Sequence, residues 1–302
     1  MSYATGNLVI VGLGLIGGSL ARALRQSGFS QCFIGYGHRE PSLQRGVELG
    51  VIDEFTLDLD EAVERADIMV ICTPTLTAGR LLEKILPRLS GRSGGPIVTD
   101  VASVKGCLRD TAITVSGSMP PQLVLGHPIA GSEHSGVDAS SAELFVNHRV
   151  ILTPVAGNDS EAVELVRAMW VSAGADVVDM TVEQHDAVLS ATSHLPHVLA
   201  YALVDALSSS EDSDEIFRCA AGGFRDFTRI ASSDPAMWRD IAIANRTALL
   251  KSIDLFSEHL NRLRGCVQDQ NAEELLDTFT RAKQARDAFA AILAQRIEPK
   301  AP

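Results

Sequence analysis

Short apolar runs alternate with amphipathic segments over the first 180 residues of the chain. The runs typical of strands are 8–11, 32–36, 68–72, 97–99, 122–125, 150–153 and 176–179. Most of them are separated by segments with the apolar spacing of a helix. Alternating strands and helices are typical of an α/β domain with a mostly parallel, doubly wound sheet.

The strand pattern stops after Asp179, and only helical periodicity follows. Thr181 and Gln184 have the spacing of a helix-starting capping box, and apolar residues recur from there to Leu207. Pro196 predicts a kink in this helix. Two more long helical patterns cover 234–267 and 271–297. The sequence therefore predicts a domain at residues 1–180 and an all-helical domain at 181–302.

A glycine motif follows the first predicted strand and opens the first predicted helix. The segment "VGLGLIGGS" places glycines at 12, 14 and 17, in the pattern GxGxxG. Gly12 permits a tight turn, Gly14 admits a pyrophosphate, and Gly17 allows close packing of helix on strand. In this context the motif predicts a Rossmann-type dinucleotide site, rather than a merely structural turn. The cofactor-binding residues expected here are Gly12, Gly14, Leu15, Ile16 and Gly17.

The end of the second predicted strand bears on the choice of dinucleotide. NAD sites usually have an acidic residue there, but this chain has Gly37 followed by His38 and Arg39. Loss of the carboxylate removes repulsion toward a 2′-phosphate, and an arginine can bind one bidentately. The pattern favours NADP over NAD. The alternative is that Arg39 is an ordinary loop residue and that Glu40 binds the ribose of NAD.

Other polar residues follow later strands at the same edge of the sheet, where ligands of open α/β sheets bind. Thr73 and Pro74 end one strand and are expected to face the cofactor, although a plain turn is an equal alternative. Ser103 follows another strand in "TDVASVKG". The stretch "GHPIAGSEHSG", 126–136, has too many glycines and polar residues to predict a regular helix or strand. His127 within it is a candidate general base, because a histidine accepts a proton near neutral pH.

The helical half adds two candidate pairs. His194 and His197 in "SHLPH" share a helix face, but a proline separates them and no carboxylate–histidine signature accompanies them, so a metal site is not expected. Arg225 and Arg229 lie four residues apart among apolar side chains. Such arginines favour a buried anionic partner, for example a dicarboxylate substrate, although a solvated helix face is the usual alternative.

Composition narrows the class of protein. The formal net charge of −12 and the pI near 5.1 argue against a nucleic-acid binder. No apolar run of membrane-spanning length is apparent, and the first residues lack the basic region of a signal peptide. The five cysteines are scattered without a CxxC pair, which is typical of reduced thiols in the cytoplasm. We therefore expect a cytoplasmic protein with no membrane, nucleic-acid or metal partner.

Taken together, the motifs resemble those of the prephenate dehydrogenase family, which includes the arogenate and cyclohexadienyl dehydrogenases of tyrosine biosynthesis. The segments that carry the resemblance are "VGLGLIGGS", "TDVASVKG", "GHPIAGSEHSG", "SHLPH" and "GGFRDFTRIASSDPAMWRDI", between about residue 7 and beyond residue 260. The resemblance implies an oxidoreductase that passes a hydride to NAD or NADP while its substrate loses carbon dioxide. It also implies a helical domain that forms a homodimer.

The resemblance also implies roles for individual residues. His127 matches the catalytic histidine of the family, and Ser103 matches a serine that helps to orient the substrate hydroxyl and the nicotinamide. Arg229 matches an arginine that binds a substrate carboxylate, and His197 a histidine near the substrate side chain. The residues implied in supporting roles at the substrate are Ser193, Glu133 and Arg225.

Three alternatives remain open on the sequence. The enzyme could be specific for arogenate with NADP. It could be another dehydrogenase of similar architecture acting on a β-hydroxy acid, but such enzymes use a lysine in the helical domain, and none occurs between Lys105 and Lys251. It could be a non-enzymatic dinucleotide sensor, which leaves His127, Ser103 and Arg229 without a reason to occur together. Neither a fused chorismate mutase segment nor an added regulatory domain is expected.

Overall fold

The computed structural model describes residues 5–89, 95–131 and 134–297. The strands are β1 (Thr5–Val11), β2 (Ser30–Tyr36), β3 (Glu54–Thr56), β4 (Ile68–Ile71), β5 (Ile97–Asp100), β6 (Leu123–Val124), β7 (Gly126–Pro128), β8 (Arg149–Leu152) and β9 (Asp176–Asp179). The helices up to β9 are α1 (Leu15–Ser27), α2 (Glu40–Glu48), α3 (Leu59–Arg65), α4 (Thr75–Leu89), α5 (Gly106–Ser116), η1 (Val137–Ala139) and α6 (Ser160–Ser172). Those after it are α7 (Val182–Leu189), η2 (Ser190–His194), α8 (Leu195–Ser208), α9 (Ser213–Arg218), α10 (Gly222–Thr228), η3 (Arg229–Ser232), α11 (Pro235–Ala244), α12 (Arg246–Gln268) and α13 (Ala272–Ile297).

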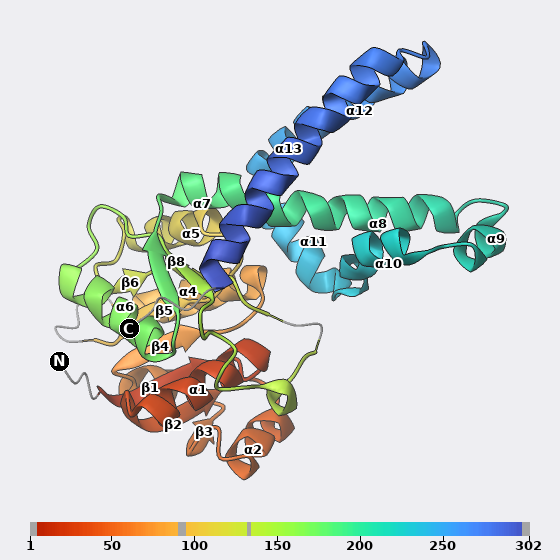
Figure 1. Ribbon diagram of the computed structural model, residues 1–302. Coiled ribbons are helices and arrows are strands. Elements are labelled where there is room, and N and C mark those ends of the chain that lie inside the picture. Colours follow the sequence, from red (N-terminus) through yellow and green to blue (C-terminus); the bar gives the residue numbers. More distant parts are fainter. Residues whose placement is uncertain (1–4, 90–94, 132–133, 298–302) are drawn as a thin grey trace. The chain divides into compact units, whose positions relative to one another are not determined.

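Six parallel strands form the main sheet, in the order β3-β2-β1-β4-β5-β6 (Figure 1). This is the strand order of dinucleotide-binding Rossmann domains, as the alternating pattern predicts. The seven predicted runs all contain strands, whereas β3 was not predicted. Strand β3 has only three residues and begins with the charged Glu54, so it is too short to show the alternation of apolar and polar residues that predicts a strand.

Strand β1 shows how the two faces of the sheet are covered. Leu8 and Ile10 point into a core shared with α1 and α6, whereas Val9 and Val11 point into a core shared with α3, α4 and α5. All four side chains are at most 1% exposed. A strand buried on both faces has a continuous apolar run, which is why β1 was readily predicted.

A second, three-stranded sheet has the order β7-β8-β9, and its first strand corrects a prediction. The stretch 126–136 was expected to be irregular, but Gly126–Pro128 pairs antiparallel with β8, with His127 opposite Ile151. The backbone groups of β8 provide the pairing that the local sequence did not suggest. Pro128 is tolerated because β7 is an edge strand. The base candidate is thus held on a strand.

Helices follow β9, as predicted. The hydroxyl of Thr181 accepts a hydrogen bond from the Gln184 backbone N–H, and the Gln184 side chain accepts one from the Thr181 N–H, which is the predicted capping box. A single π-turn, η2, lies where a kink was predicted, immediately before Pro196 in the first turn of α8. Proline lacks the N–H that a continuous helix needs, and π-turns occur often at functional sites.

The helical run Val182–Ser208 contains an 18-residue window with a mean hydropathy of 1.3, so it could cross a membrane by length and composition alone. The expectation that the sequence contains no such run was therefore wrong. Its uncharged serines, threonines and histidines interrupt the apolar pattern without adding charge. One run of this kind is weak evidence for a membrane, because helices that pack against protein pass the same test.

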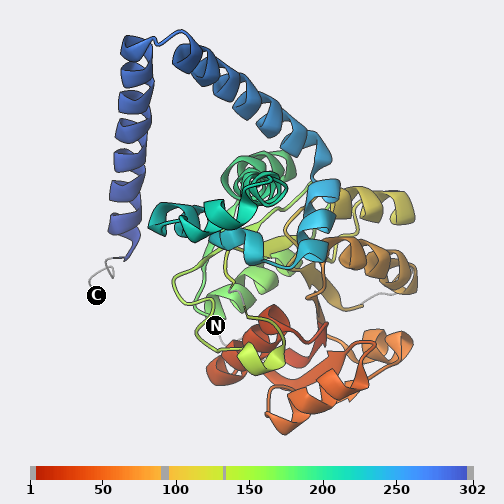
Figure 2. The same ribbon diagram turned by 90° about the vertical axis from the view of Figure 1, so that its right-hand side faces the viewer.

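The chain divides into two compact units, residues 1–249 and 250–302, each described by itself. In the first unit, α11 packs against α4 and α5 packs against α7, so that helices after β9 lie beside the sheet's own helices. In the second unit, α12 and α13 are joined by a short turn in which Gln270 has a φ of 53° (Figure 2). The domain division at residue 180 stays a prediction.

Candidate active site

The glycine loop between β1 and α1 is shaped by close contacts on two of its three glycines. Gly12 has a φ of +98°, and a Cβ on it would lie 2.8 Å from the carbonyl oxygen of Cys72. A Cβ on Gly17 would lie 2.5 Å from the carbonyl oxygen of Gly12. A Cβ on Gly14, in contrast, would meet nothing within 4 Å. The loop therefore packs tightly against β4 and leaves open space only at Gly14, where a pyrophosphate would approach.

The surroundings of the loop fit a dinucleotide. Gly14 is the N-cap of α1 and provides no side-chain cap, so the N–H groups at Leu15 and Ile16 remain available to an anion at the positive end of the helix. Thr73 and Pro74 lie between β4 and α4. The Thr73 hydroxyl is buried and has no hydrogen-bond partner among the described residues. A buried hydroxyl of this kind is expected where a ligand completes the hydrogen bonds.

The cofactor-selecting segment lies between β2 and α2. Gly37 comes directly after Tyr36, the last residue of β2, and His38, Arg39 and Glu40 are exposed. Arg39 is the N-cap of α2 and makes no side-chain cap. This turn therefore contains groups that suit either dinucleotide. Arg39 and the N-terminus of α2 could bind the 2′-phosphate of NADP, and Glu40 could bind the ribose 2′-hydroxyl of NAD.

The strongest candidate for chemistry is a group of histidines around β7. His127 is 9% exposed, and its Nδ1 lies 2.9 Å from Nε2 of the fully buried His185 of α7. Nδ1 of His185 lies 2.8 Å from a carboxylate oxygen of Asp186. Burial lowers the pKa of His127 well below its ordinary value of 6.5, and His185, Lys105 and His194 lower it further. The imidazole of His127 is therefore neutral, and able to accept a proton, at neutral pH.

A buried ion pair holds the strand that carries His127. Lys105 and Asp100 are both fully buried and bonded to each other. Nζ of Lys105 also donates to the carbonyl oxygen of Gly126, at 2.5 Å, and Asp100 accepts from the Gly126 N–H, at 3.3 Å. The residue before His127 is thus fixed through both its backbone groups. Ser103, half-buried, lies in the same loop between β5 and α5.

His194 has a defined tautomer and an unsatisfied donor. The amide nitrogen of Asn245 donates to the Asp186 carbonyl, at 2.9 Å, and to Nδ1 of His194, at 3.1 Å. Burial above all lowers the pKa of His194 to about 4, so this histidine is neutral and carries its proton on Nε2. That nitrogen is buried without a partner among the described residues. A buried unpaired donor costs about 1–3 kcal/mol unless a ligand or water accepts its proton.

The predicted substrate residues Ser193 and His197 lie in η2 and in the first turn of α8, and Arg229 lies in η3, which packs against α8. His197 accompanies Ser193, whose carbonyl oxygen lies 3.0 Å from the His197 Nδ1. Burial lowers the pKa of His197, the Ser193 carbonyl partly offsets this, and the nearby charge of Arg229 lowers it further. Trp238 of α11 stacks on the His197 ring, with centroids 3.5 Å apart. An indole and an imidazole thus stack here, and a guanidinium is near enough for its charge to lower the pKa of the imidazole.

Two predicted residues are not part of this group. The side chain of Arg225 is 79% exposed and pairs with the adjacent Asp226 at 3.0 Å, so its role at the substrate stays a prediction. The apolar neighbours of Arg225 belong to the short helix α10, which has no buried residues. Glu133 lies outside the described residues. Among the residues that are described, no group of three possible metal ligands occurs.

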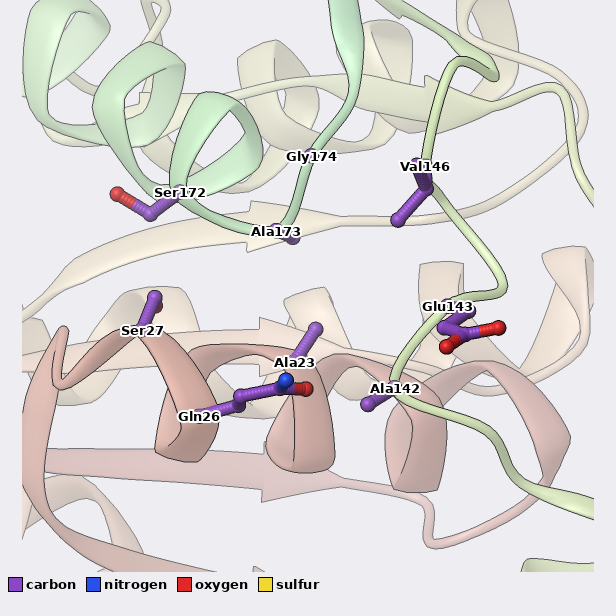
Figure 3. A pocket seen from close by; sticks show the side chains of 9 residues that line it. All are labelled: Ala23, Gln26, Ser27, Ala142, Glu143, Val146, Ser172, Ala173 and Gly174. Atoms are coloured by element: carbon purple, nitrogen blue, oxygen red, sulfur yellow. The ribbon is translucent and has the colours of Figure 1, made fainter.

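A cavity of about 580 Å³ lies elsewhere, between the last turns of α1 and α6 (Figure 3). Ala23 and Ser27 of α1 face Ser172 and Gly174, with Glu143 as the only charged residue in the lining. This is the amino edge of the parallel sheet, where α1 ends. Its lining has no histidine and no cation, so it is not the candidate site.

Comparison with known families identifies the chain. The model of the prephenate dehydrogenase nucleotide-binding domain matches residues 20–179, and that of the prephenate dehydrogenase dimerization domain matches residues 181–281. The chain belongs to the prephenate dehydrogenase family. The resemblance seen in the motifs is thereby confirmed.

Similar proteins within the prephenate dehydrogenase family cover nearly all of the chain. A cyclohexadienyl dehydrogenase of Zymomonas mobilis is 37% identical over 94% of this chain and 96% of its own. A prephenate dehydrogenase of Bacillus subtilis is 38% identical over 96% of this chain and 77% of its own. The crystal structure of Aquifex aeolicus prephenate dehydrogenase with hydroxyphenyl propionate and NAD+ has a TM-score of 0.86 and 38% identity, over 96% of this chain and 100% of that one.

Within this prephenate dehydrogenase fold, the sequence did not reveal some of the residues around the base. His185 and Asp186 are adjacent in the first turns of α7 and looked like ordinary helix residues. Trp238 and Asn245 lie at opposite ends of α11 and became prominent only through their contacts with His197 and His194. The one available signal was the adjacent His-Asp pair, since a carboxylate beside a histidine is a common way to orient the ring.

Proposed function

We propose that this protein catalyses the oxidative decarboxylation of prephenate to 4-hydroxyphenylpyruvate, with hydride transfer to a nicotinamide dinucleotide. The observation that carries the proposal is the buried, neutral His127 at the carboxyl edge of the sheet. Its strand β7 contacts β5, which lies two strand spacings, about 10 Å, from β1 and its glycine loop. That separation suits a dinucleotide whose pyrophosphate is bound at Gly14 and whose nicotinamide reaches the base.

The chemistry requires one base and at least one cation. A bound nicotinamide dinucleotide would supply the acceptor for the hydride that leaves the ring carbon bearing the hydroxyl group. His127 accepts the hydroxyl proton, which leaves a dienone with the ring carboxylate in a vinylogous β-keto position. The carboxylate departs as carbon dioxide, its electron pair completes the aromatic ring, and the resulting phenolate takes up a proton. Ser103, in the loop beside β7, is positioned to orient the reacting hydroxyl.

The choice of prephenate over arogenate rests on charge. Arg229 is close enough to His197 to lower its pKa, and it would attract the carboxylate of a keto-acid side chain. The ammonium group of arogenate would bring a second positive charge next to that guanidinium. Because the Zymomonas mobilis relative is a cyclohexadienyl dehydrogenase, arogenate is the second candidate substrate.

NADP is the preferred cofactor in this proposal, and NAD the alternative. The turn after β2 provides Arg39 and the N-terminus of α2 for a 2′-phosphate, and no carboxylate precedes Glu40. The solved Aquifex aeolicus relative is in complex with NAD+, so family membership does not decide between them.

A homodimer is proposed as well, since residues 181–281 match the dimerization domain of the family and the second unit exposes many large apolar side chains. We also propose a cytoplasmic location, in keeping with the biosynthetic relatives.

A two-by-two assay tests these assignments together. Prephenate and arogenate are each combined with NAD and NADP, and cofactor reduction is followed by absorbance. We expect the highest kcat/KM with prephenate and NADP. The variant His127→Asn should lower kcat by roughly 10²–10⁴-fold without changing cofactor affinity, the usual effect of losing a general base. Activity with arogenate alone, or a clear NAD preference, would overturn the corresponding assignment.

A further inference from the structure

Three side chains form a continuous line of hydrogen bonds from β7 into α7. Nδ1 of His127 lies 2.9 Å from Nε2 of His185, and Nδ1 of His185 lies 2.8 Å from Oδ1 of Asp186. The two rings meet edge to face, with centroids 5.1 Å apart. The mechanism above uses only His127, so the roles of the other two remain to be assigned.

Asp186 sets the direction of the line because it can only accept. Its Oδ1 accepts from the backbone N–H of Lys105, at 2.9 Å, and its Oδ2 from that of Gly106, at 2.8 Å. Burial alone would raise the pKa of Asp186, but the hydrogen bonds from His185, Lys105 and Gly106 outweigh it and lower that pKa. Asp186 is therefore an ionised carboxylate that caps the N-terminus of α5, and its third donor is His185 Nδ1–H.

The tautomer of His185 follows from its partner. Burial lowers the pKa of His185, and the hydrogen bond to Asp186 offsets only part of this, so the ring is neutral at pH 7. A neutral ring with its proton on Nδ1 has a lone pair on Nε2. Nε2 of His185 must then accept from His127, which requires that His127 carries its own proton on Nδ1.

We propose that His185 and Asp186 are positioning residues that hold His127 in its Nδ1–H tautomer, with the lone pair on Nε2 directed to the substrate hydroxyl. The proposal rests on the proposed function for the identity of that hydroxyl, but the tautomer itself does not depend on it. A histidine whose wrong nitrogen is protonated cannot act as the base, and a carboxylate-oriented ring is the common remedy. Here an intervening histidine transmits the orientation from the carboxylate.

The line also provides a place for the positive charge. When Nε2 of His127 takes the substrate proton, the Nδ1 proton of His127 can move to Nε2 of His185. The charge then lies on the ring that is hydrogen-bonded to the Asp186 carboxylate, which raises the pKa of His185, rather than on His127, whose pKa is lowered by His185, Lys105 and His194. One proton enters His127 and one leaves it, so the line ends as a His185–Asp186 ion pair.

Two substitutions of His185 separate orientation from a merely structural role. In His185→Leu the acceptor for the Nδ1 proton of His127 is lost, and we expect kcat to fall about 10²–10³-fold while KM for prephenate and the Kd for the dinucleotide change less than about twofold. In His185→Gln an amide oxygen can replace Nε2 as acceptor, and we expect kcat to recover to within about tenfold of the wild type. His148→Leu is the matched control, because the His148 side chain is exposed and, among the described residues, its ring nitrogen Nδ1 contacts the carbonyl oxygen of Val146 two residues away.

Imidazole nitrogen NMR of the wild-type enzyme reads the tautomer directly, whether or not any variant folds. The expected result is a protonated Nδ1 and an unprotonated Nε2 for His127 at pH 7. Protonation at Nε2, or an unchanged kcat in folded His185→Leu, would overturn the proposal. A wild type that reduces no cofactor with either substrate would instead refute the proposed function, and the NMR result would still decide the tautomer.

Discussion

At the residue scale, the environment of His127 matters more than its identity. A histidine in a loop would titrate near 6.5, but this one is buried beside His185, Lys105 and His194, and its pKa is well below that value. Each of these neighbours disfavours the imidazolium form. His127 is therefore unprotonated on one ring nitrogen at neutral pH and can accept a proton. The ionised Asp186, which is hydrogen-bonded to His185, provides a negative charge to balance the proton that is taken up.

This environment predicts the acid side of the pH profile. The neutral form of His127 is the active one, so kcat/KM should fall as pH decreases through its lowered pKa. We expect kcat/KM for prephenate to stay level from about pH 8 down to about 6.5 and to decline only at lower pH. The carboxyl groups of the substrate titrate near pH 4, so their protonation does not affect the level part of the profile. Steady-state rates in overlapping buffers measure this. An acid limb centred above pH 6.5 would contradict it, and the residual activity of His127→Asn should lack the limb.

At the element scale, the Lys105–Asp100 pair joins three elements: the end of β5, the start of α5 and the start of β7. Both charges are fully buried, and Asp100 also accepts from the Ala102 N–H at 2.8 Å. An unpaired buried charge destabilises the folded protein far more than a buried pair does. Removal of either partner alone is therefore expected to lower the stability of the protein strongly. It also explains how a short edge strand bearing a proline holds His127 in place.

The variant Lys105→Met tests this directly. It leaves Asp100 buried without its cation and the Gly126 carbonyl without its donor, so the free energy of unfolding should fall by about 3–5 kcal/mol. Urea denaturation at pH 7 measures the change. Lys84→Met on the exposed face of α4 is the control and should stay within about 0.5 kcal/mol of the wild type. A Lys105→Met protein as stable as the control would show that the pair contributes nothing.

At the scale of the whole molecule, the second unit exposes large apolar side chains to solvent. In α13, Leu276 is 66% exposed, Phe279 58% and Phe289 50%. Exposed apolar side chains at this density are typical of protein interfaces. Because residues 181–281 match the dimerization domain of the family, the proposed partner is a second copy of the chain.

Sedimentation of the purified protein tests the dimer. We expect twice the mass of the 32.2 kDa chain, and a shift toward monomer when Phe279→Glu places a charge in the apolar face. Lys283→Gln is the control on the same helix, since Lys283 is 76% exposed and pairs only with Asp287. A monomeric wild type would refute the proposed assembly.

The sequence by itself determined the parts of this protein that depend on local pattern. The apolar runs predicted the strands of the main sheet other than β3, the three glycines predicted the dinucleotide loop, and Thr181 with Gln184 predicted the start of α7. Each of these signals is a spacing of a few residues imposed by backbone geometry. The family itself could be recognised for the same reason, since its motifs are short and continuous.

Only the tertiary structure decided how the base is held. His127 and His185 are 58 residues apart, Lys105 reaches across 21 residues to Gly126, and β7 exists because β8 offers it backbone partners. No local periodicity encodes such pairs, because the burial that makes a charge or an imidazole seek a partner arises only after the sheet and the helices have packed. The sequence pointed to His127 as the candidate base, and packing determined its pKa and its neighbours.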